Sequence, residues 1–526
     1  MQGQWTGELV GPDVWATCRE LIPAGSMFAF LAEHREELFP GGMFADMYPS
    51  PNGRPSMPPQ VLAAALVLQA LYGVSDFDAV QELRCDLRWK AACGLGLYDT
   101  AFDASLLTYF RRRLARSADP DRIFTRVKEI VAATGVLKGR QRRALDSTVL
   151  QDAVATQDTV TQLIAAIRAV IREVPGAAPV AAAQCTGHDY ADPGKPRIAW
   201  KDAQARAALV DALVGDAIAL PAELPEQPLD DKGANAVGIL ALVAYQDVEP
   251  APDSDGRDGR WRIARRAAPD RMVSTVDPES RHVHKSRTQY QDGYKAHLAV
   301  EPETGLFTDV ALRPGTGAAH HEAAVATDLL ADERAPVTVL GDAAYGTGAA
   351  RRALTDAGHR LIIKPPPLKQ TIAGGFTVDD FHIDTAAGKA TCPAGHTTAL
   401  GRPQPDGSHI AQFKKVCAPC PLRARCTTSA TGRNVTIHAQ HDLLAAARTQ
   451  AVTDPAWQAD HRRWRPPVER AVAQVVARGN RRLRYLGVIK NNTWLHTRAA
   501  ALNLRTLINL GLTRTSGAWI LAPSST

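Results

Sequence analysis

Two aspartates have residue types and neighbours suited to holding a divalent cation. Asp146 lies in the run RRALDSTVL, and Asp342 ends the apolar run in VTVLGDAAYG. Both runs are typical of short strands, so we expect Asp146 on or at the end of a strand and Asp342 at the end of one. The small residues that follow them leave room for a bulky substrate. Mg²⁺ prefers oxygen ligands and keeps several waters, so two or three carboxylates from distant parts of the chain are enough to hold it.

Glu469 is the third candidate because of the charges around it. The segment from His461 to Lys490 contains nine Lys or Arg, and Glu469 is its one acid. VERAVAQVV follows two prolines, which are tolerated at a helix start, so we expect Glu469 in the first turn of a helix. Two divalent cations about 4 Å apart can generate a nucleophile and stabilise the leaving oxygen of a phosphodiester. Asp146, Asp342 and Glu469 therefore predict a catalytic Mg²⁺ or Mn²⁺ site.

These carboxylates also have plain structural interpretations. An aspartate at a strand end commonly caps a turn or the next helix. A lone glutamate among cations can form salt bridges and nothing more.

Cations interleaved with aromatic residues in the same segment predict a surface for DNA phosphates. The predicted DNA-binding residues are Arg465, Arg481, Arg482, Arg484, Tyr485 and Lys490. A second basic run, Arg111–Arg113, lies on an expected helix near the N-terminus, where phosphate contact and a solvated helix face are equally compatible with it.

Four of the eight cysteines crowd into one short segment. In a reducing compartment such crowding suggests metal rather than disulfides. Zn²⁺ takes four thiolate or imidazole ligands in a tetrahedron. The alternative is reduced cysteines without a metal, because the spacing departs from the usual pair of CxxC motifs. The set predicted for structural zinc is Cys392, Cys417, Cys420 and Cys426, with His396 as an alternate.

The elements expected around these residues divide the chain into four regions. Residues 1–135 predict an N-terminal helical domain. Residues 140–515 alternate short strands with helices and predict a mixed α/β domain that carries the three carboxylates. Two insertions are expected within it, a helical one over residues 155–268 and a cysteine-rich one over residues 370–440.

Strand and helix signals alternate after the helical insertion. RMVSTVD, YKAHLAV and LFTDVALR are expected strands, and EPETG between the last two suits a hairpin. HHEAAVATDLLAD is an expected helix. His320, His321 and Glu322 at its start could approach the carboxylates, but we prefer capping or solvation of the helix and leave them out of the metal site. Lys295 and His297 share one face of YKAHLAV and are expected to face DNA or solvent.

Composition limits the classes of protein to which the chain can belong. The chain has 526 residues, of which 45% are hydrophobic and 22% charged, as in large folded proteins. A net charge of +6 permits a nucleic-acid partner without requiring one. No apolar stretch reaches the roughly 18 to 20 residues of a membrane span. The N-terminus lacks the basic start and apolar run of a secretory signal, so we expect a cytoplasmic protein.

Several segments resemble bacterial insertion-sequence transposases of the DDE type, specifically the insertion-sequence 1182 family. The resemblance covers most of the chain and implies an RNase H-like catalytic fold, in which Asp146 and Asp342 match the two family aspartates and Glu469 the glutamate. The segments that carry it are MYPSPNGRPSMPPQVLAAALVLQALYGVSDFDAVQELRCDLRW, LDSTVLQDAVATQDTVTQL, DPESRHVHKSRTQYQDGYKAHLAV, VLGDAAYG and VERAVAQVVARGNRRLRYLGVIKNNTWLHTRAAALNL.

Related transposases carry a Tyr, Arg, Glu, Lys signature around the glutamate. Arg465 matches the arginine four residues before Glu469. Arg462 stands in place of the tyrosine and Val476 in place of the lysine. The role of that lysine could pass to one of three later cations, namely Arg481, Arg482 or Lys490.

The resemblance implies a metal-dependent transposase that is associated with the nucleoid. Water would hydrolyse the end of the element, and the freed 3′-hydroxyl would attack target DNA. The N-terminal domain would bind terminal inverted repeats or join protomers into a homodimer, because two ends must be cut together. Two alternatives remain: a catalytically inactive, zinc-containing DNA-binding relic, and a nuclease without strand transfer.

Overall fold

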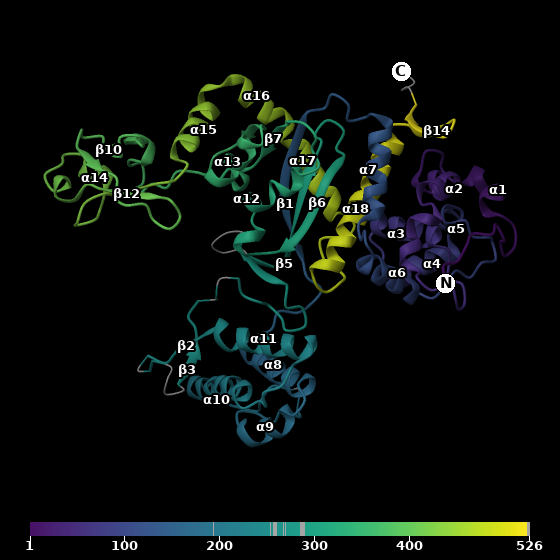
Figure 1. Ribbon diagram of the computed structural model, residues 1–526, viewed down its shortest axis with the longest axis horizontal. Helices are drawn as coiled ribbons and strands as arrows, with labels where there is room; N and C mark the ends of the chain where they lie inside the picture. Colours follow the sequence, from purple (N-terminus) through teal and green to yellow (C-terminus); the bar gives the residue numbers. More distant parts are fainter. Residues whose placement is uncertain are drawn as a thin grey trace.

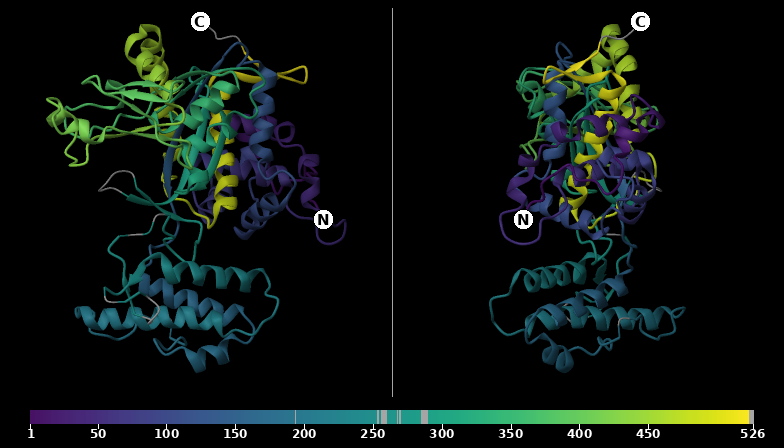
Figure 2. Two further views of the ribbon diagram at one scale, coloured as in Figure 1. Left: turned by 60° about the vertical axis from the view of Figure 1, so that its left-hand side comes forward. Right: turned by 90° about the vertical axis from the view of Figure 1, so that its right-hand side faces the viewer.

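The computed structural model describes residues 1–192, 194–252, 254–255, 260–266, 268, 270–284 and 290–522. A central sheet flanked by helices forms the body of the molecule, and a group of N-terminal helices packs beside it (Figure 1). Two lobes extend from the sheet. One is helical and lies below the sheet, and the other contains short strands and lies at the end opposite the N-terminal helices (Figures 1 and 2).

The N-terminal helices surround α3 (Pro59–Tyr72). Every residue of α3 from Pro59 to Leu71 is buried, as expected for a helix that is apolar on all sides. Proline at its start and Gly73 in the left-handed conformation, with φ of 70°, define its two ends. The neighbouring helices are α1 (Val14–Cys18), α2 (Met27–Leu38), α4 (Asp76–Cys85), α5 (Leu87–Cys93), α6 (Ser105–Arg116) and α7 (Arg122–Thr134).

Within the described residues, no single helix has both the length and the apolar character needed to cross a membrane. Among these described helices, one pair, α3 and α4, reaches that length and composition when taken together, and the chain bends by 111° between them.

The central sheet has mixed strand directions. β1 (Arg142–Gln151) runs antiparallel to β5 (Tyr290–Val300) and parallel to β7 (Thr338–Gly341), which is parallel to β8 (Arg360–Ile363). β6 (Phe307–Pro314) and the short β4 (Arg281–His284) both pair antiparallel with β5. The expected hairpin is therefore confirmed as β5–β6, and β1 lies between the antiparallel and the parallel parts of the sheet.

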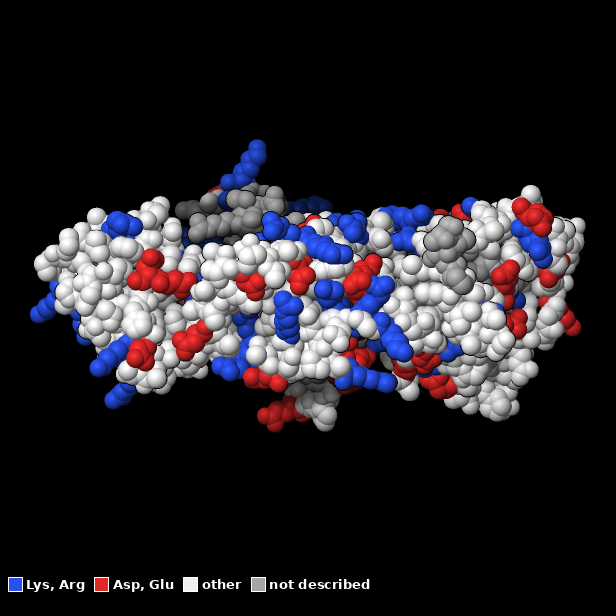
Figure 3. Space-filling view, turned by 90° about the horizontal axis from the view of Figure 1, so that it is seen from above, with Lys and Arg blue, Asp and Glu red and all other residues white. Residues whose placement is uncertain are grey.

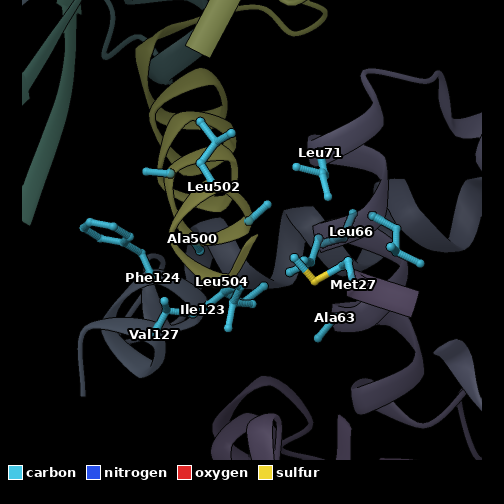
Figure 4. Close-up of a cluster of buried hydrophobic side chains, with 14 of the residues drawn as sticks. Met27, Ala63, Leu66, Leu71, Ile123, Phe124, Val127, Ala500, Leu502 and Leu504 are labelled. Carbon is cyan, nitrogen blue, oxygen red and sulfur yellow. The ribbon is translucent and has the colours of Figure 1, made fainter. Parts of the chain in front are cut away.

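Alternate residues of the strands face two different cores, as the pleat of a strand requires. Ala144 and Leu340 face a core that continues through α17 (Pro466–Val476) and α18 (Val488–Asn509) into the N-terminal helices. Figure 4 shows α18, with Leu502 and Leu504, between the α7 side chains and those of α2 and α3. Leu145 and Val339 face a smaller core on the other side. That side is covered by α12 (Glu322–Val325) and α13 (Gly348–Asp356).

The lower lobe has a hydrophobic core that is separate from those of the sheet. This lobe is inserted in the chain between β1 and β4. Because both insertion points lie at strand ends, β1 still pairs with its neighbours along the sheet. Its elements are α8 (Thr159–Glu173), α9 (Ala177–Gln184), α10 (Ala203–Ala222), α11 (Asp231–Gln246), β2 (Val248–Pro250) and β3 (Trp261–Ile263).

The strand-rich lobe is built around a small core that includes Phe381 and Phe413. From it α15 (His441–Thr453) and α16 (Pro455–Trp464) lead back to α17, and the hairpin β14 (Leu512–Thr515) and β15 (Ala518–Leu521) follows α18. The lobe contains β9 (His382–Asp384), β10 (Lys389–Thr391), β11 (Thr397–Ala399), β12 (His409–Gln412), α14 (Arg423–Cys426) and β13 (Asn434–Ile437).

Two expected elements are wrong. RMVSTVD forms only an isolated bridge, between Met272 and Arg281, because the Met272 carbonyl accepts hydrogen bonds from the side chains of Gln162 and Gln246 instead of from a strand. HHEAAVATDLLAD is broken into the four-residue α12 and a short 3₁₀ turn, although its apolar residues still pack against the sheet.

Candidate active site

The parallel pair β1 and β7 brings Asp146 and Asp342 to neighbouring backbone positions. Ala144 of β1 is the partner of Leu340 in β7. Asp146 and Asp342 each follow this last register pair by two residues, on chains that run in the same direction, and the charge of Asp342 acts on Asp146. Asp342 follows directly after β7, as expected, and Asp146 lies on β1, which continues beyond it to Gln151.

Asp146 is largely buried and is paired with a cation that directly precedes α17. Its carboxylate lies 2.8 Å from Nη2 of Arg465, and its side chain is 13% exposed. Nη1 of Arg465 also donates to the Leu145 carbonyl at 2.9 Å. Burial raises the pKa of Asp146, the attraction of Arg465 opposes that rise, and the charge of Asp342 adds to it. The pKa of Asp146 remains raised, so the attraction of Arg465 is weaker than the effect of burial.

Asp342 is exposed at the end of β7. Its carboxylate accepts a hydrogen bond from the Ala344 backbone N–H at 3.0 Å, which caps the following 3₁₀ turn. The capping interpretation of this aspartate is correct, but the cap uses only one of the two carboxylate oxygens. The other oxygen can take a further ligand.

Glu469 lies in the first turn of α17, as expected, and its side chain is exposed. It is one helical turn after Arg465, and residues four apart on a helix are neighbours on its surface. The structure thus places Glu469 on the helix whose start contacts Asp146, without bringing it into a cluster with the two aspartates.

Tyr345 lies close to carboxylates from both faces of the sheet. The residue is completely buried, and its hydroxyl has no hydrogen-bond partner in the described part of the chain. Burial raises the pKa of Tyr345 well above its ordinary value, and the charges of Glu322, Asp146 and Asp342 raise it further. Three carboxylates therefore lie near one phenol.

Glu322 is a neighbour of this site that we did not expect from the sequence. Its carboxylate accepts a hydrogen bond from Ser147 Oγ at 2.7 Å and pairs with Lys295 at 2.9 Å. Lys295 and His297 lie largely inside the protein, so the expectation that they face DNA or solvent is wrong. Burial lowers the pKa of His297 to about 4. Nothing in the local pattern identifies Glu322, because Ser147 precedes it by 175 residues.

The predicted DNA-binding residues have different environments. Arg465 is held inside by Asp146, and Arg481 donates to the Val149 carbonyl of β1 at 3.2 Å. The side chain of Arg111 lies over the ring of Tyr485 at 4.8 Å. The remaining three, Arg482, Arg484 and Lys490, are exposed. Lys and Arg are interspersed with Asp and Glu on the face that Figure 3 shows, so no single sign of charge covers it.

The four clustered cysteines line one pocket, together with His396 and three phenylalanines. Burial raises the pKa of the Cys426 thiol, and the other three cysteines contribute to the rise. Cys392, Cys417 and Cys426 pack against the core of their lobe.

No three His, Cys, Asp or Glu within the described residues form a group that could hold a metal ion. The described residues thus show no formed metal-holding group at these thiols, and structural zinc there stays a prediction from the sequence. Asp146, Asp342 and Glu469 likewise do not form a group of three ligands within the described residues. Asp146 and Asp342 are neighbours, and Glu469 is exposed to solvent.

Comparisons with known proteins match two segments of the chain. Residues 16–113, which include the end of α1, all of α2 to α5 and most of α6, match the family model "Transposase domain (DUF772)". Residues 391–508, which include the four cysteines, Arg465 and Glu469, match the model "Transposase DDE domain". No curated protein and no solved structure matches the chain. Together the two family matches indicate a transposase, an enzyme that acts on DNA.

Proposed function

We propose that the chain is a DDE-type transposase of the insertion-sequence 1182 family whose central sheet is an RNase H-like catalytic domain. The strand order supports this proposal, because β1 pairs with the β5–β6 hairpin on one side and with parallel β7 and β8 on the other. In this proposal residues 1–135 bind the terminal inverted repeats or join two protomers. Residues 140–515 carry catalysis, with insertions at 155–268 and 370–440.

The repulsion that Asp342 exerts on Asp146, two residues beyond the last register pair of β1 and β7, is the observation that supports catalysis most strongly. Two carboxylates at adjacent strand positions repel each other, and this repulsion contributes to the raised pKa of Asp146. A divalent cation would relieve that repulsion. Mg²⁺ is usually held by one or two carboxylates together with waters and substrate phosphates, so the two aspartates fit it without a complete protein cage.

The residues have separate roles in the proposed reaction. Asp146 and Asp342 hold Mg²⁺ or Mn²⁺, and Glu469 contributes the third carboxylate from α17. Arg465 fixes the orientation of Asp146, since its guanidinium is itself bonded to the Leu145 carbonyl. The metal, when bound, supplies activation of water and stabilisation of the leaving oxygen. Hydrolysis at the end of the element frees a 3′-hydroxyl, which then attacks a phosphodiester of the target.

Cleavage of labelled DNA that carries the ends of the element tests this function. We expect nicking with Mg²⁺ that leaves a 3′-hydroxyl, and no nicking with EDTA. A second, unlabelled duplex in the same reaction detects joining. Nicks without joined product would favour a nuclease. Binding without cleavage in any divalent metal would contradict the catalytic proposal.

A further inference from the structure

Two hollows lie along α6, one among the N-terminal residues and one where these residues meet the segment after α17. One, of about 850 Å³, is lined by Tyr109, Arg112, Arg113 and Arg116 of α6 with neighbouring residues. The other, of about 880 Å³, is lined by Arg112, Arg484 and Lys490, among others. Arg112 lines both hollows, and we call the surface that the two hollows make together the α6 groove.

The acids of the α6 groove are already neutralised by arginines of the N-terminal helices. Asp46, in the first hollow, accepts two hydrogen bonds from Arg122, at 2.6 and 2.8 Å. Asp76, in the second, is paired with Arg111, whose side chain is 14% exposed. Neither acid is therefore available to compensate the other cations of the groove.

Four of the remaining cations have no carboxylate partner within the described chain. Arg112, Arg113, Arg116 and Lys490 are exposed, and the first two lie over the rings of tyrosines. The fifth cation, Arg484, donates to the Gly73 carbonyl. Arg112 and Arg116 are one helical turn apart, about 6 Å along the axis. The groove thus presents a row of uncompensated positive charges.

The segment that forms one wall of the groove also contacts the strand of the candidate active site. Gln151 at the end of β1 donates its N–H to the Arg481 carbonyl at 2.8 Å and accepts from the Leu483 N–H at 2.8 Å. Three residues after Arg481, Arg484 is in the groove. Asp146 precedes Gln151 by five residues of strand, which is roughly 17 Å at about 3.3 Å per residue.

We propose that the α6 groove binds the sugar-phosphate backbone of duplex DNA and directs it towards Asp146. This inference rests on the proposed function and adds a surface shared by the N-terminal helices and the segment after α17. Phosphate contacts position a duplex without reading its sequence. Arg111 lies over the ring of Tyr485 at 4.8 Å, and this contact joins the two walls of the second hollow.

Three single substitutions test the groove: Arg112→Gln, Arg116→Gln and Lys490→Gln. Removing one phosphate contact should reduce the slope of log affinity against log salt by about 0.9. We expect each variant to show that reduction and a several-fold weaker affinity for a labelled duplex of random sequence, measured by fluorescence anisotropy over a salt series. The matched control is Arg206→Gln, which removes an exposed arginine of α10 far from the groove in the helical lobe.

The outcomes separate the groove from catalysis. Wild-type affinity and salt slope in all three variants, or an equal loss in Arg206→Gln, would overturn the groove. Thermal melting of each variant checks that it remains folded. A protein whose groove variants lose DNA binding but which never cleaves DNA would retain the groove and contradict the proposed catalysis.

Discussion

Asp146 and Glu322 are two carboxylates on opposite faces of β1, and their surroundings match closely. The side chain of each is 13% exposed, and the cations paired with them, Arg465 and Lys295, are 14% and 12% exposed. Yet the pKa of Asp146 is raised and that of Glu322 is lowered.

The difference comes from the remaining neighbours. Burial alone would raise the pKa of Glu322, but the attraction of Lys295 and hydrogen bonds from Lys295 and Ser147 outweigh it. At Asp146, burial prevails over Arg465, and Asp342 adds repulsion. The protein therefore stabilises the charged form of Glu322 and disfavours that of Asp146, and under the proposed function a bound divalent cation would stabilise the Asp146 carboxylate. Equal burial therefore does not imply an equal role.

The largest expected effect is on catalysis, in Asp342→Asn. This change removes one metal ligand beside Asp146, and we expect cleavage to fall by about a thousandfold, equivalent to ~4 kcal/mol. The pKa of Asp146 should fall towards its ordinary value, because the repulsion from Asp342 is gone. Single-turnover cleavage and carboxyl NMR measure the two effects. Cleavage at the wild-type rate would remove Asp342 from the site.

Glu322→Gln should affect stability instead. The substitution leaves the largely buried Lys295 without its carboxylate, and breaking a buried pair in this way costs about 3 kcal/mol. Urea unfolding would measure the loss. Ser147→Ala is the matched control, since it removes only one hydrogen bond to Glu322 and should cost about 1 kcal/mol. Equal, small losses in both variants would mean that Lys295 does not depend on Glu322.

Arg465→Gln should change the pH dependence of metal use. Arg465 lowers the pKa of Asp146, so its loss should raise that pKa further. Metal binding needs the ionised carboxylate. In the variant, protons therefore compete with Mg²⁺ for the Asp146 carboxylate at a higher pH than in wild type. More Mg²⁺ is needed as the pH falls. We expect the Mg²⁺ concentration that gives half-maximal cleavage to increase by about tenfold, which corresponds to ~1.4 kcal/mol less free energy of metal binding. A pH profile identical to wild type would contradict this role.

The smallest effect, on the free energy of unfolding, is expected for Tyr345→Phe, whose hydroxyl is influenced by the charges of Glu322, Asp146 and Asp342. Its buried hydroxyl has no partner within the described chain, so replacing it should leave stability unchanged or raise it by up to about 1 kcal/mol. Urea unfolding is again the measurement. A loss greater than that of Ser147→Ala would show that the hydroxyl has a partner in solution.

Local pattern is sufficient to place the residues that lie in regular elements. Asp342 follows a short apolar strand, and Glu469 lies at the start of a helix after two prolines, as the sequence predicts. The family signature predicts an arginine four residues before Glu469, and Arg465 is that residue. It does not predict the bond of Arg465 to Asp146, because that contact joins residues more than 300 positions apart.

Contacts of this kind explain the other errors. Glu322 is expected at a solvated helix start because such a start gives no sign of a serine on a distant strand. RMVSTVD has the composition of a strand, yet glutamine side chains of the helical lobe take its backbone bonds. Zinc at the four cysteines is not one of these errors and stays a prediction from their spacing, because the described residues include no formed metal-holding group that would test it.

The most direct test of the comparison between the two carboxylates is the rate of Mg²⁺-dependent DNA cleavage by Asp146→Asn beside Glu322→Gln, under conditions where both variants are folded. We predict that Asp146→Asn binds DNA but loses cleavage by about a thousandfold, whereas Glu322→Gln cleaves within about tenfold of wild type. Full loss of cleavage in Glu322→Gln, with activity retained in Asp146→Asn, would contradict this prediction and place the reaction on the other face of β1.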